Sequence, residues 1–364
     1  MRRWCRFPVR YAAVAAALGL LLALAACGGG GEKPPAASPT AGAPTRAAPV
    51  GATAAPASAT SSCKPGNGPP KEGLASGLKG RITYVRLVFG CQPDIYIMNG
   101  DGSDATALTT DPALDDESDL SPDGRKVVFF SGREGNAYVY VMNADGSGLT
   151  RLTGGGGGDT SPRWSPDGKR IAYSHSGSIV VMDADGSNAK TIMQAQDAGT
   201  AEPCRAGSFV GSWSPDGKRI VYYSAIVQPD RYAFWICAVD ADGGEPQVLV
   251  SQPEGKLHAE PYWSPDGRRI VYRDDRDGNC TQGGAGACNY EIYVLDLETG
   301  QETNVTKHPA LDIEPVWSPD GQWILFASNR DDPNFDLYVV RPDGTGLQRV
   351  LADPESKDSY PSWR

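Results

Sequence analysis

The chain contains the segment Trp317-Ser-Pro-Asp-Gly321, and its last four residues occur five times in 364 residues. The copies begin at Ser121, Ser165, Ser214, Ser264 and Ser318, so they are 44, 49, 50 and 54 residues apart. Tryptophan precedes four of the copies, and Leu120 precedes the first. A repeat at this period indicates one structural unit that is used several times, and it decides the fold class before any single residue is considered.

Each copy lies between two stretches that alternate apolar and polar residues. Proline presets the first corner of a tight turn, aspartate tolerates the second, and glycine accepts the left-handed conformation, so the tetrapeptide predicts a hairpin. A third strand such as 138–142 and a short fourth strand such as 149–153 follow the hairpin. Four antiparallel strands in roughly 50 residues are typical of one blade of a β-propeller.

The two ends of the chain together supply a sixth blade. Residues 81–86, 94–98 and 105–109 match the second, third and fourth strands of a blade, whereas 358–363 repeats the pattern of a first strand. We therefore expect an all-β, six-bladed propeller of four-stranded antiparallel blades over residues 79–364. The C-terminal strand would join blade one, which closes the ring and leaves no free sheet edge.

These repeats resemble a known family. The pattern Asp-x-x-x-x-Trp-Ser-Pro-Asp-Gly-Lys/Arg-x-Ile, followed by Ile-Tyr-Val-Met-Asp-Ala-Asp-Gly and Leu-Thr, is similar to the TolB-type, WD40-like propeller repeats. The resemblance covers nearly everything after residue 78 and implies the fold more specifically than the function. Such propellers serve as adaptors, as substrate gates in prolyl-oligopeptidase-like proteins and occasionally as enzymes. We find no counterpart of the α/β domain that precedes the TolB propeller, so TolB's partners are not expected to transfer automatically.

The N-terminus predicts export. Residues 1–26 combine four arginines with an apolar stretch that is too short and alanine-rich for a permanent membrane helix, which is typical of a signal peptide. The segment Leu24-Ala-Ala-Cys27-Gly28 resembles a bacterial lipobox, which implies cleavage before Cys27 and acylation of that cysteine. An ordinary secretory signal with an incidental cysteine is the alternative. We expect a lipid-anchored protein on the exported face of the bacterial cell envelope, attached to either the plasma or the outer membrane.

The segment after the signal is a linker by composition. Residues 27–62 are almost wholly alanine, proline, glycine, serine and threonine without an aromatic residue, so they predict a disordered tether. We expect residues 63–78 to be an ordered or semi-ordered lead-in to the propeller.

Cysteine usage agrees with export. Outside the signal peptide and Cys27 there are six cysteines, an even number that predicts three disulfides in an exported protein. Fifteen pairings are possible, and the spacing favours Cys280–Cys288, Cys204–Cys237 and Cys63–Cys91. No Cys-x-x-Cys spacing occurs, so we do not expect a zinc site.

The charge limits the partners. The net charge is −10, and cleavage of the signal would remove four arginines and no acidic residue, which leaves about −14. This balance argues against nucleic acid as a partner and against direct attraction to anionic lipids, so we expect the lipid anchor to be the only membrane attachment. We expect a monomer.

The candidate binding site is a ring of acidic residues on the innermost strands. The positions five residues before each first-strand tryptophan, or its equivalent, are Asp115, Asp159, Ser208, His258, Asp312 and Asp358. The positions three residues before it are Glu117, Ser161, Val210, Glu260, Glu314 and Tyr360. These residues are expected to surround one mouth of the central channel, where converging carboxylates would favour Ca²⁺ or a basic peptide loop. The alternative is that each aspartate caps neighbouring backbone amides.

Catalytic motifs are absent from the sequence. It contains no Gly-x-Ser-x-Gly elbow, His-Glu-x-x-His motif or phosphate loop, and its only histidines are His175, His258 and His308. A propeller lyase of the oligogalacturonate type would be expected to gather several histidines around a metal, whereas only His258 falls in the predicted ring. We therefore expect an adaptor or sensor for a protein, peptide or glycan, with no cofactor other than possible Ca²⁺. The alternative is a lyase or hydrolase that uses His258 and the nearby carboxylates.

Two further features concern packing and recognition. The tryptophans recur at fixed blade positions, which predicts packing between neighbouring blades rather than carbohydrate stacking.

Insertions at 194–209 and 274–289, and a loop widened by 228–235, break the repeat and are candidate recognition loops.

Overall fold

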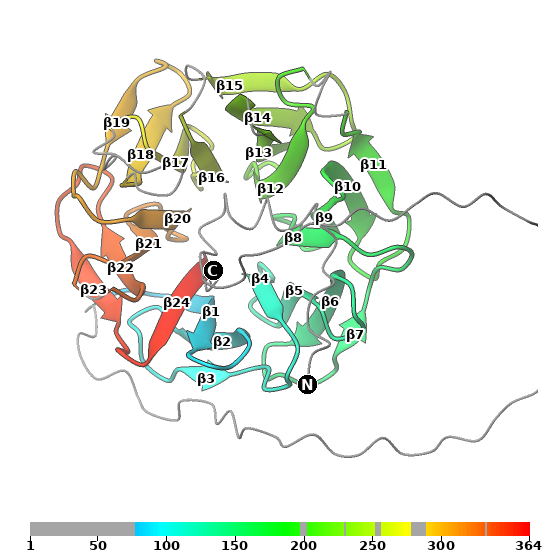
Figure 1. The fold of residues 1–364 in the computed structure, drawn as a ribbon, viewed down its shortest axis with the longest axis horizontal. Coiled ribbons are helices and arrows are strands. Elements are labelled where there is room, and N and C mark those ends of the chain that lie inside the picture. Colours follow the sequence, from blue (N-terminus) through cyan, green and yellow to red (C-terminus); the bar gives the residue numbers. More distant parts are fainter. Residues whose placement is uncertain (1–76, 197–201, 229–230, 252–255, 278–288, 332) are drawn as a thin grey trace, which may run out of the picture. The chain divides into compact units, whose positions relative to one another are not determined.

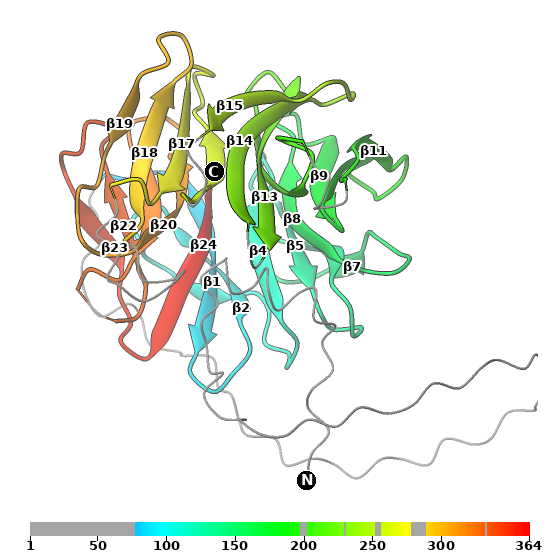
Figure 2. The same cartoon turned by 45° about the horizontal axis from the view of Figure 1, so that its top comes forward.

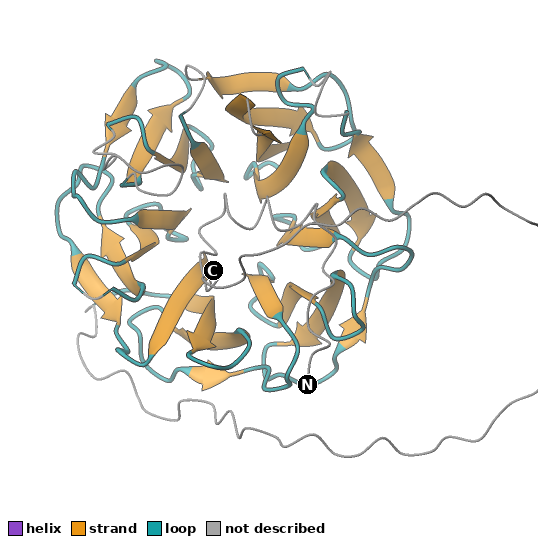
Figure 3. Cartoon of the chain, in the orientation of Figure 1, coloured by secondary structure: helices purple, strands orange, loops and turns teal. Residues whose placement is uncertain are grey.

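The computed structural model describes residues 77–196, 202–228, 231–251, 256–277, 289–331 and 333–364. The predicted signal peptide, the tether, Cys27 and Cys63 lie outside these ranges, as do Cys280 and Cys288. The described residues form 24 strands in six four-stranded antiparallel sheets, which Figure 3 shows joined by loops and turns. Within these residues no helix has the length and apolar character needed to span a membrane.

The first three blades follow one another in chain order. Blade 1 contains β24 (Ser356–Trp363), β1 (Arg81–Val88), β2 (Asp94–Asn99) and β3 (Thr106–Ala107). Blade 2 contains β4 (Asp115–Leu120), β5 (Lys126–Ser131), β6 (Tyr138–Asn143) and β7 (Thr150–Arg151). Blade 3 contains β8 (Asp159–Trp164), β9 (Arg170–His175), β10 (Ser178–Asp183) and β11 (Lys190–Met193).

The other three blades repeat the same order. Blade 4 contains β12 (Gly207–Trp213), β13 (Arg219–Gln228), β14 (Arg231–Asp240) and β15 (Gln247–Ser251). Blade 5 contains β16 (His258–Trp263), β17 (Arg269–Asp274), β18 (Glu291–Asp296) and β19 (Glu302–Asn304). Blade 6 contains β20 (Asp312–Trp317), β21 (Ile324–Ser328), β22 (Asp336–Val340) and β23 (Gln348–Leu351).

The C-terminal strand closes the ring, as the sequence predicts. Strand β24 pairs antiparallel with β1, from Ile82 opposite Trp363 to Val88 opposite Ser356. The innermost strands β4, β8, β12, β16, β20 and β24 contact one another in cyclic order around the axis along which Figure 1 looks. Strand β24 lies beside β1 in both Figure 1 and Figure 2. The first and last segments of the propeller therefore share one sheet.

The Ser-Pro-Asp-Gly turns have a common hydrogen-bond network. In the first copy the Ser121 hydroxyl donates to Asp123 Oδ1 at 2.6 Å and accepts from the backbone N–H of Lys126 at 2.9 Å. Gly124 has a φ of 69°, a left-handed value that favours glycine. The other four copies repeat the serine–aspartate hydrogen bond at 2.5–2.7 Å. In each copy the aspartate side chain therefore stabilises the turn by accepting a hydrogen bond from the serine hydroxyl.

The core lies between adjacent blades, and the tryptophans belong to it. Trp213 of blade 4 is 5 % exposed and lies in one apolar cluster with Ala172 and Ile179 of blade 3. Its indole N–H donates to the backbone carbonyl of Arg163 at 3.0 Å, and the Arg170 guanidinium lies 4.8 Å from its ring. This confirms packing between blades as the role of the repeated tryptophans.

Blade 4 corrects one expectation. Residues 228–235 were expected to widen a loop, but β13 and β14 continue as a paired ladder to Gln228 opposite Arg231. Both segments are rich in β-branched and aromatic residues, which favour strand pairing over an open loop. Figure 2 shows these two strands as a long hairpin.

One predicted disulfide lies fully within the described residues. Cys204 and Cys237 are joined, and both are buried. Cys237 faces Tyr222 across the β13–β14 ladder, at the position where four other blades have a second aromatic residue. Cys91 is also disulfide-bonded, but its predicted partner and the Cys280–Cys288 pair lie outside the described ranges.

Candidate functional site

The two predicted sets of ring residues have different surroundings. The positions five residues before the tryptophan lie within the first three residues of the innermost strands and are all buried, with at most 1 % of each residue exposed. Asp115 of blade 2 accepts hydrogen bonds from Arg133 Nη2 at 3.0 Å, and the Arg133 guanidinium lies 5.0 Å from the Tyr140 ring. The carboxylate is therefore neutralised inside its own blade.

Blades 1 and 6 repeat this pairing. Arg86 Nε donates to Asp358 Oδ1 at 2.8 Å, and Arg330 Nη2 donates to Asp312 Oδ1 at 2.9 Å. Burial raises the pKa of Asp358 to about 6, although the Arg86 guanidinium opposes the shift. In blade 3, Asp159 is held by Thr153 and His175 at 2.5 and 2.6 Å. Asp115, Asp312 and Asp358 are therefore buried ion-pair partners of arginines, and Asp159 is held by His175 and by Thr153, which follows β7. Their carboxylates are engaged inside the fold.

His258 is also removed from the expected ring. It is 0 % exposed, and burial lowers its pKa to about 4, although the Phe234 backbone carbonyl opposes the shift. The imidazole is thus neutral at neutral pH and shielded from solvent. In this blade the cation is Arg276, which pairs with Asp274, the residue opposite His258.

The positions three residues before the tryptophan form a second ring with strained backbone. Five of its six members have a positive φ between 48° and 57°, namely Glu117, Ser161, Glu260, Glu314 and Tyr360. A register shift between the first and second strands of the blade occurs at the same place in blades 2, 3, 5 and 6. Such a bulge re-aims the side chain and the N–H group of the extra residue.

The re-aimed groups join neighbouring blades. Glu117 Oε2 accepts from the Ser161 N–H at 2.5 Å, Glu260 Oε2 accepts from the Glu314 N–H at 2.8 Å, and Glu314 Oε2 accepts from the Tyr360 N–H at 2.5 Å. Each glutamate therefore binds the equivalent residue of the next blade. A carboxylate that accepts backbone N–H groups is held in one orientation.

The glutamates also interact across the ring. Burial raises the pKa of Glu117 in blade 2, and the like charge of Glu260 in blade 5, on the opposite side of six blades, adds to it. Burial and the charge of Glu260 raise the pKa of Glu314 to about 8, against the opposing charges of Lys357 and Arg273. Asp116 has a strongly raised pKa through burial and the charges of Glu117 and Glu314. We call Asp116, Glu117, Glu260 and Glu314 the axial acidic cluster.

Three cations lie beside this cluster and are already engaged. Arg273 is 1 % exposed, with Nη2 3.1 Å from Glu260 Oε1 and its guanidinium 4.8 Å from the Tyr290 ring. Arg163 donates to the backbone carbonyls of Gly211, Pro162 and Glu117. Lys357 lies 4.7 Å from the Phe335 ring. Burial and repulsion between carboxylates raise the pKa of Asp116, Glu117 and Glu314, so bound protons as well as these three cations compensate the cluster.

Sequence reasoning missed part of this arrangement. Arg273, whose Nη2 lies 3.1 Å from Glu260 Oε1, adjoins the cluster but was not singled out. A usable signal for the bulge is proline, which follows the ring residue in Ser161-Pro162, Glu260-Pro261, Glu314-Pro315 and Tyr360-Pro361. Proline within a strand is confined to sheet edges and bulges, and these innermost strands have both features.

The described residues do not assemble a metal site. Among them no group of three or more histidine, cysteine, aspartate or glutamate side chains is arranged to hold a metal ion. The Ca²⁺ hypothesis therefore gains no ligand set from the ranges that the structure covers.

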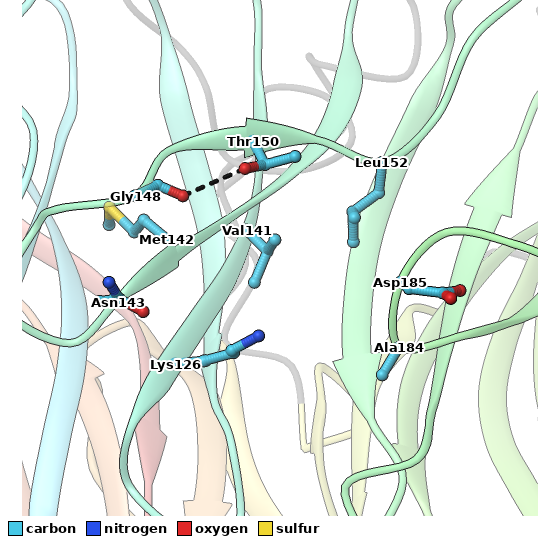
Figure 4. Close-up of a pocket in the computed structure, with 9 residues that line it drawn as sticks. All are labelled: Lys126, Val141, Met142, Asn143, Gly148, Thr150, Leu152, Ala184 and Asp185. Atoms are coloured by element: carbon cyan, nitrogen blue, oxygen red, sulfur yellow. Dashed lines mark hydrogen bonds between the residues drawn. The ribbon is translucent and has the colours of Figure 1, made fainter.

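A pocket of about 210 Å³ lies between blades 2 and 3 (Figure 4). Its lining residues are Lys126, Val141, Met142, Asn143, Gly148, Thr150, Leu152, Ala184 and Asp185. Thr150 Oγ1 donates to the Gly148 carbonyl at 3.1 Å, and Asp185 Oδ1 accepts from the Ser187 hydroxyl at 2.6 Å. These two polar groups are therefore already hydrogen-bonded within the turns that form the pocket. For this reason we place the candidate site at the axial acidic cluster and not in this pocket.

The fold and its repeat define a closed β-propeller with an acidic axis. Residues 80–204 and 176–364 match the family model described as the TolB beta propeller domain. The chain belongs to this family.

The relatives share the repeat over short segments. An uncharacterized protein of Agrobacterium fabrum is 32 % identical over 74 residues, which cover 20 % of this chain and 23 % of that protein. The Tol-Pal system protein TolB of Syntrophus aciditrophicus is 42 % identical over 48 residues, 13 % of this chain and 10 % of that protein. The chain thus matches less than a quarter of the length of these relatives.

The structure of TolB from Acinetobacter baumannii has a TM-score of 0.61 to this chain. The two are 20 % identical, and the similarity covers 78 % of this chain and 66 % of that protein. At this identity the likeness shows the shared fold alone.

Proposed function

We propose that this chain is an exported, lipid-anchored protein of the cell envelope whose propeller binds a protein or peptide at its axis. It would act as an adaptor or sensor. The observation that carries the proposal is the axial acidic cluster, in which Glu117, Glu260 and Glu314 come from three blades and each accepts a hydrogen bond from the backbone of the next blade. A rigid ring of carboxyl groups at the axis offers a partner hydrogen-bonding groups and, once deprotonated, negative charge.

The family supports a binding role. One relative is named Tol-Pal system protein TolB, and 48 of its residues are 42 % identical to this chain. The lyase or hydrolase alternative needed an accessible His258, and the burial of that residue removes its main acid-base group. Binding without catalysis is therefore the favoured function.

The location follows from the N-terminal segment. We propose that Cys27 carries the lipid and that residues 28–62 tether the propeller away from the membrane. A second acyl group would make the attachment firmer than a single chain allows.

The experiment is in vivo crosslinking of the full chain, followed by identification of the crosslinked proteins. A Glu117→Gln/Glu314→Gln variant keeps side-chain size but removes two titratable carboxyl groups from the axis. A Glu298→Gln variant is the matched control, because Glu298 is exposed in a turn far along the chain from the axial positions. The proposal expects a partner that is captured by the native chain and the control but lost from the axial variant. The same capture by all three proteins, or by none, would reject it.

A further inference from the structure

An arginine joins blades 3 and 4 beside the Ser-Pro-Asp-Gly turn. Arg170, two residues after the turn glycine of blade 3, lies 4.8 Å from the Trp213 ring of blade 4. Its Nη1 lies 3.4 Å from Asp242 Oδ1, and its Nη2 donates to the Gly217 carbonyl at 2.9 Å. Two further arginines at the same repeat position lie over the tryptophan of the next blade. The guanidinium therefore fills the space between neighbouring blades at this level.

Blades 2 and 3 lack this contact. Lys126 stands at the position of Arg170, two residues after its own turn glycine. Asp185 stands at the position of Asp242, because both belong to an Asp-Ala-Asp-Gly turn. Among the residues that the structure describes, the Lys126 ammonium has no hydrogen bond, ion pair or ring contact. Lysine ends in a compact ammonium group rather than a planar fork, so it does not fill the volume that an arginine fills.

The pocket of about 210 Å³ lies at this missing contact. Lys126 of blade 2 and Asp185 of blade 3 lie at two sides of it, and Val141 and Leu152 belong to its apolar lining (Figure 4). The turn engages Asp185 Oδ1 only, through the backbone N–H and the hydroxyl of Ser187. Within the described ranges no group donates to Asp185 Oδ2. The pocket therefore offers one free ammonium group and one free carboxylate oxygen beside apolar side chains.

We propose that this pocket binds a small zwitterion with an apolar side chain, which is the chemistry of a free α-amino acid or a short peptide. The ligand carboxylate would accept from the Lys126 ammonium, and the ligand ammonium would donate to Asp185 Oδ2. The apolar side chain would lie against Val141 and Leu152, which removes apolar surface from water. The pocket shares no residue with the axial acidic cluster, so this inference goes beyond the proposed partner binding and does not depend on it.

Charge complementarity selects a zwitterion over a simple ion. An anion held by Lys126 would also face the carboxylate of Asp185, and a cation held by Asp185 would also face the ammonium of Lys126. A ligand of one sign therefore loses at one wall what it gains at the other, whereas a zwitterion satisfies both. A hollow of this volume has room for several water molecules or for one small organic molecule.

The test is calorimetric titration of the full chain with L-leucine and with L-leucyl-L-leucine at neutral pH. N-acetyl-L-leucine lacks the ammonium group, and L-leucinamide lacks the carboxylate. We expect leucine to bind about tenfold more tightly than either derivative, because each derivative loses one charge-assisted hydrogen bond. Tighter binding of the dipeptide than of leucine would support the zwitterion site and assign it to short peptides. Equal binding of leucine and a derivative, or no binding of leucine and the dipeptide, would overturn the proposal.

Lys126→Arg is the most specific variant. It keeps the positive charge but introduces the residue that blade 3 has at this position, so the guanidinium would occupy the pocket beside Asp185. We expect this variant to fold, because three other blades carry arginine there, and to weaken leucine binding by about tenfold or more. Native affinity for leucine in Lys126→Arg would refute the assignment.

Two further variants test the two charges separately. Lys126→Met and Asp185→Asn should each weaken leucine binding by about tenfold. Lys169→Met is the matched control, because Lys169 is exposed beside the turn of blade 3 and does not line the pocket. An equal loss of affinity in the control would show that net charge governs binding, and it would remove the pocket from the explanation.

The two proposals fail in different ways. If a partner crosslinks in an axis-dependent manner but neither leucine nor the dipeptide binds, the pocket inference is wrong and the binding function at the axis stands. If leucine binds in a Lys126-dependent manner but no axis-dependent partner is found, the pocket inference stands and the proposed function is wrong.

Discussion

Replacing Asp312 by alanine is the sharpest test of the conclusion that the buried aspartates are structural. Asp312 is 0 % exposed and accepts from the Ser328 hydroxyl at 2.5 Å and from Arg330 Nη2 at 2.9 and 3.0 Å. Arg330 is itself only 7 % exposed, and its guanidinium lies over the rings of Phe326 and Tyr338 at 5.2 and 5.1 Å. The substitution would leave that guanidinium buried and uncompensated.

The expected loss follows from this geometry. Breaking a buried ion pair by removing one partner destabilises a protein by about 3–5 kcal/mol. Burial raises the pKa of Asp312 despite Arg330, which indicates that desolvation offsets much of the attraction within the pair. Removing both partners in Asp312→Ala/Arg330→Met should therefore cost much less than the single aspartate change, with a coupling of about 2 kcal/mol.

The assay is equilibrium unfolding in urea, with the free energy of unfolding compared among the native chain and the variants. Asp242→Ala is the control, because Asp242 is 96 % exposed and lies 3.4 Å from Arg170. We expect the control to stay within about 0.5 kcal/mol of the native chain. If Asp312→Ala also stays within that range, Asp312 is not a structural partner of Arg330. The hypothesis that it belongs to a ligand-binding ring of carboxylates at the channel mouth would then be favoured.

Three other predictions address the axis, the anchor and the core. The free energy of unfolding should fall as the pH rises from about 4.5 to about 8, because the buried Glu314 carboxyl group keeps its proton in the folded chain up to about pH 8. Urea unfolding of the native chain and of Glu314→Gln across this range checks the sign, and an equally steep fall in the variant would contradict it. Cys27→Ala should abolish lipid labelling and shift the protein from the membrane fraction to the soluble fraction, whereas labelling that persists would exclude Cys27 as the attachment site. Trp263→Ala should lower the free energy of unfolding by about 3–5 kcal/mol, because its 7 % exposed indole packs between blades 4 and 5. A small loss of stability accompanied by loss of ligand binding would instead assign this tryptophan to recognition.

The fold was predictable because its information is local and repeated. Each Ser-Pro-Asp-Gly copy sets a tight turn through its own side chains, as Ser121 and Asp123 do within two residues of each other. The resemblance of 358–363 to 312–317 then predicted the closing strand, which β24 confirms. The sequence analysis did not predict the full length of the β13–β14 hairpin, because it interpreted the extra residues 228–235 as a loop. Their strand propensity continues the two strands, which pair as far as Gln228 opposite Arg231.

The site was only half predictable. Counting back from the tryptophans found Glu117, Glu260 and Glu314 together with the buried aspartates, but it could not separate the two sets. The difference depends on Arg133, Arg330 and Arg86, which follow or occupy the second strands, and on the bulge at the glutamates.

By itself, the sequence determined the blade unit, the number of blades and the closing strand, because turn chemistry and strand alternation act between residues that are near neighbours in the chain. Only the tertiary structure decided which acidic side chains meet at the axis. That outcome requires the fold to bring together strands from blades 2, 5 and 6. It also requires a one-residue bulge that turns Glu117, Glu260 and Glu314 toward the neighbouring blade. The aspartates instead pair with arginine or histidine inside their own blades. Burial and like charge then change the protonation of these groups, and neither is visible in the order of residues along a chain.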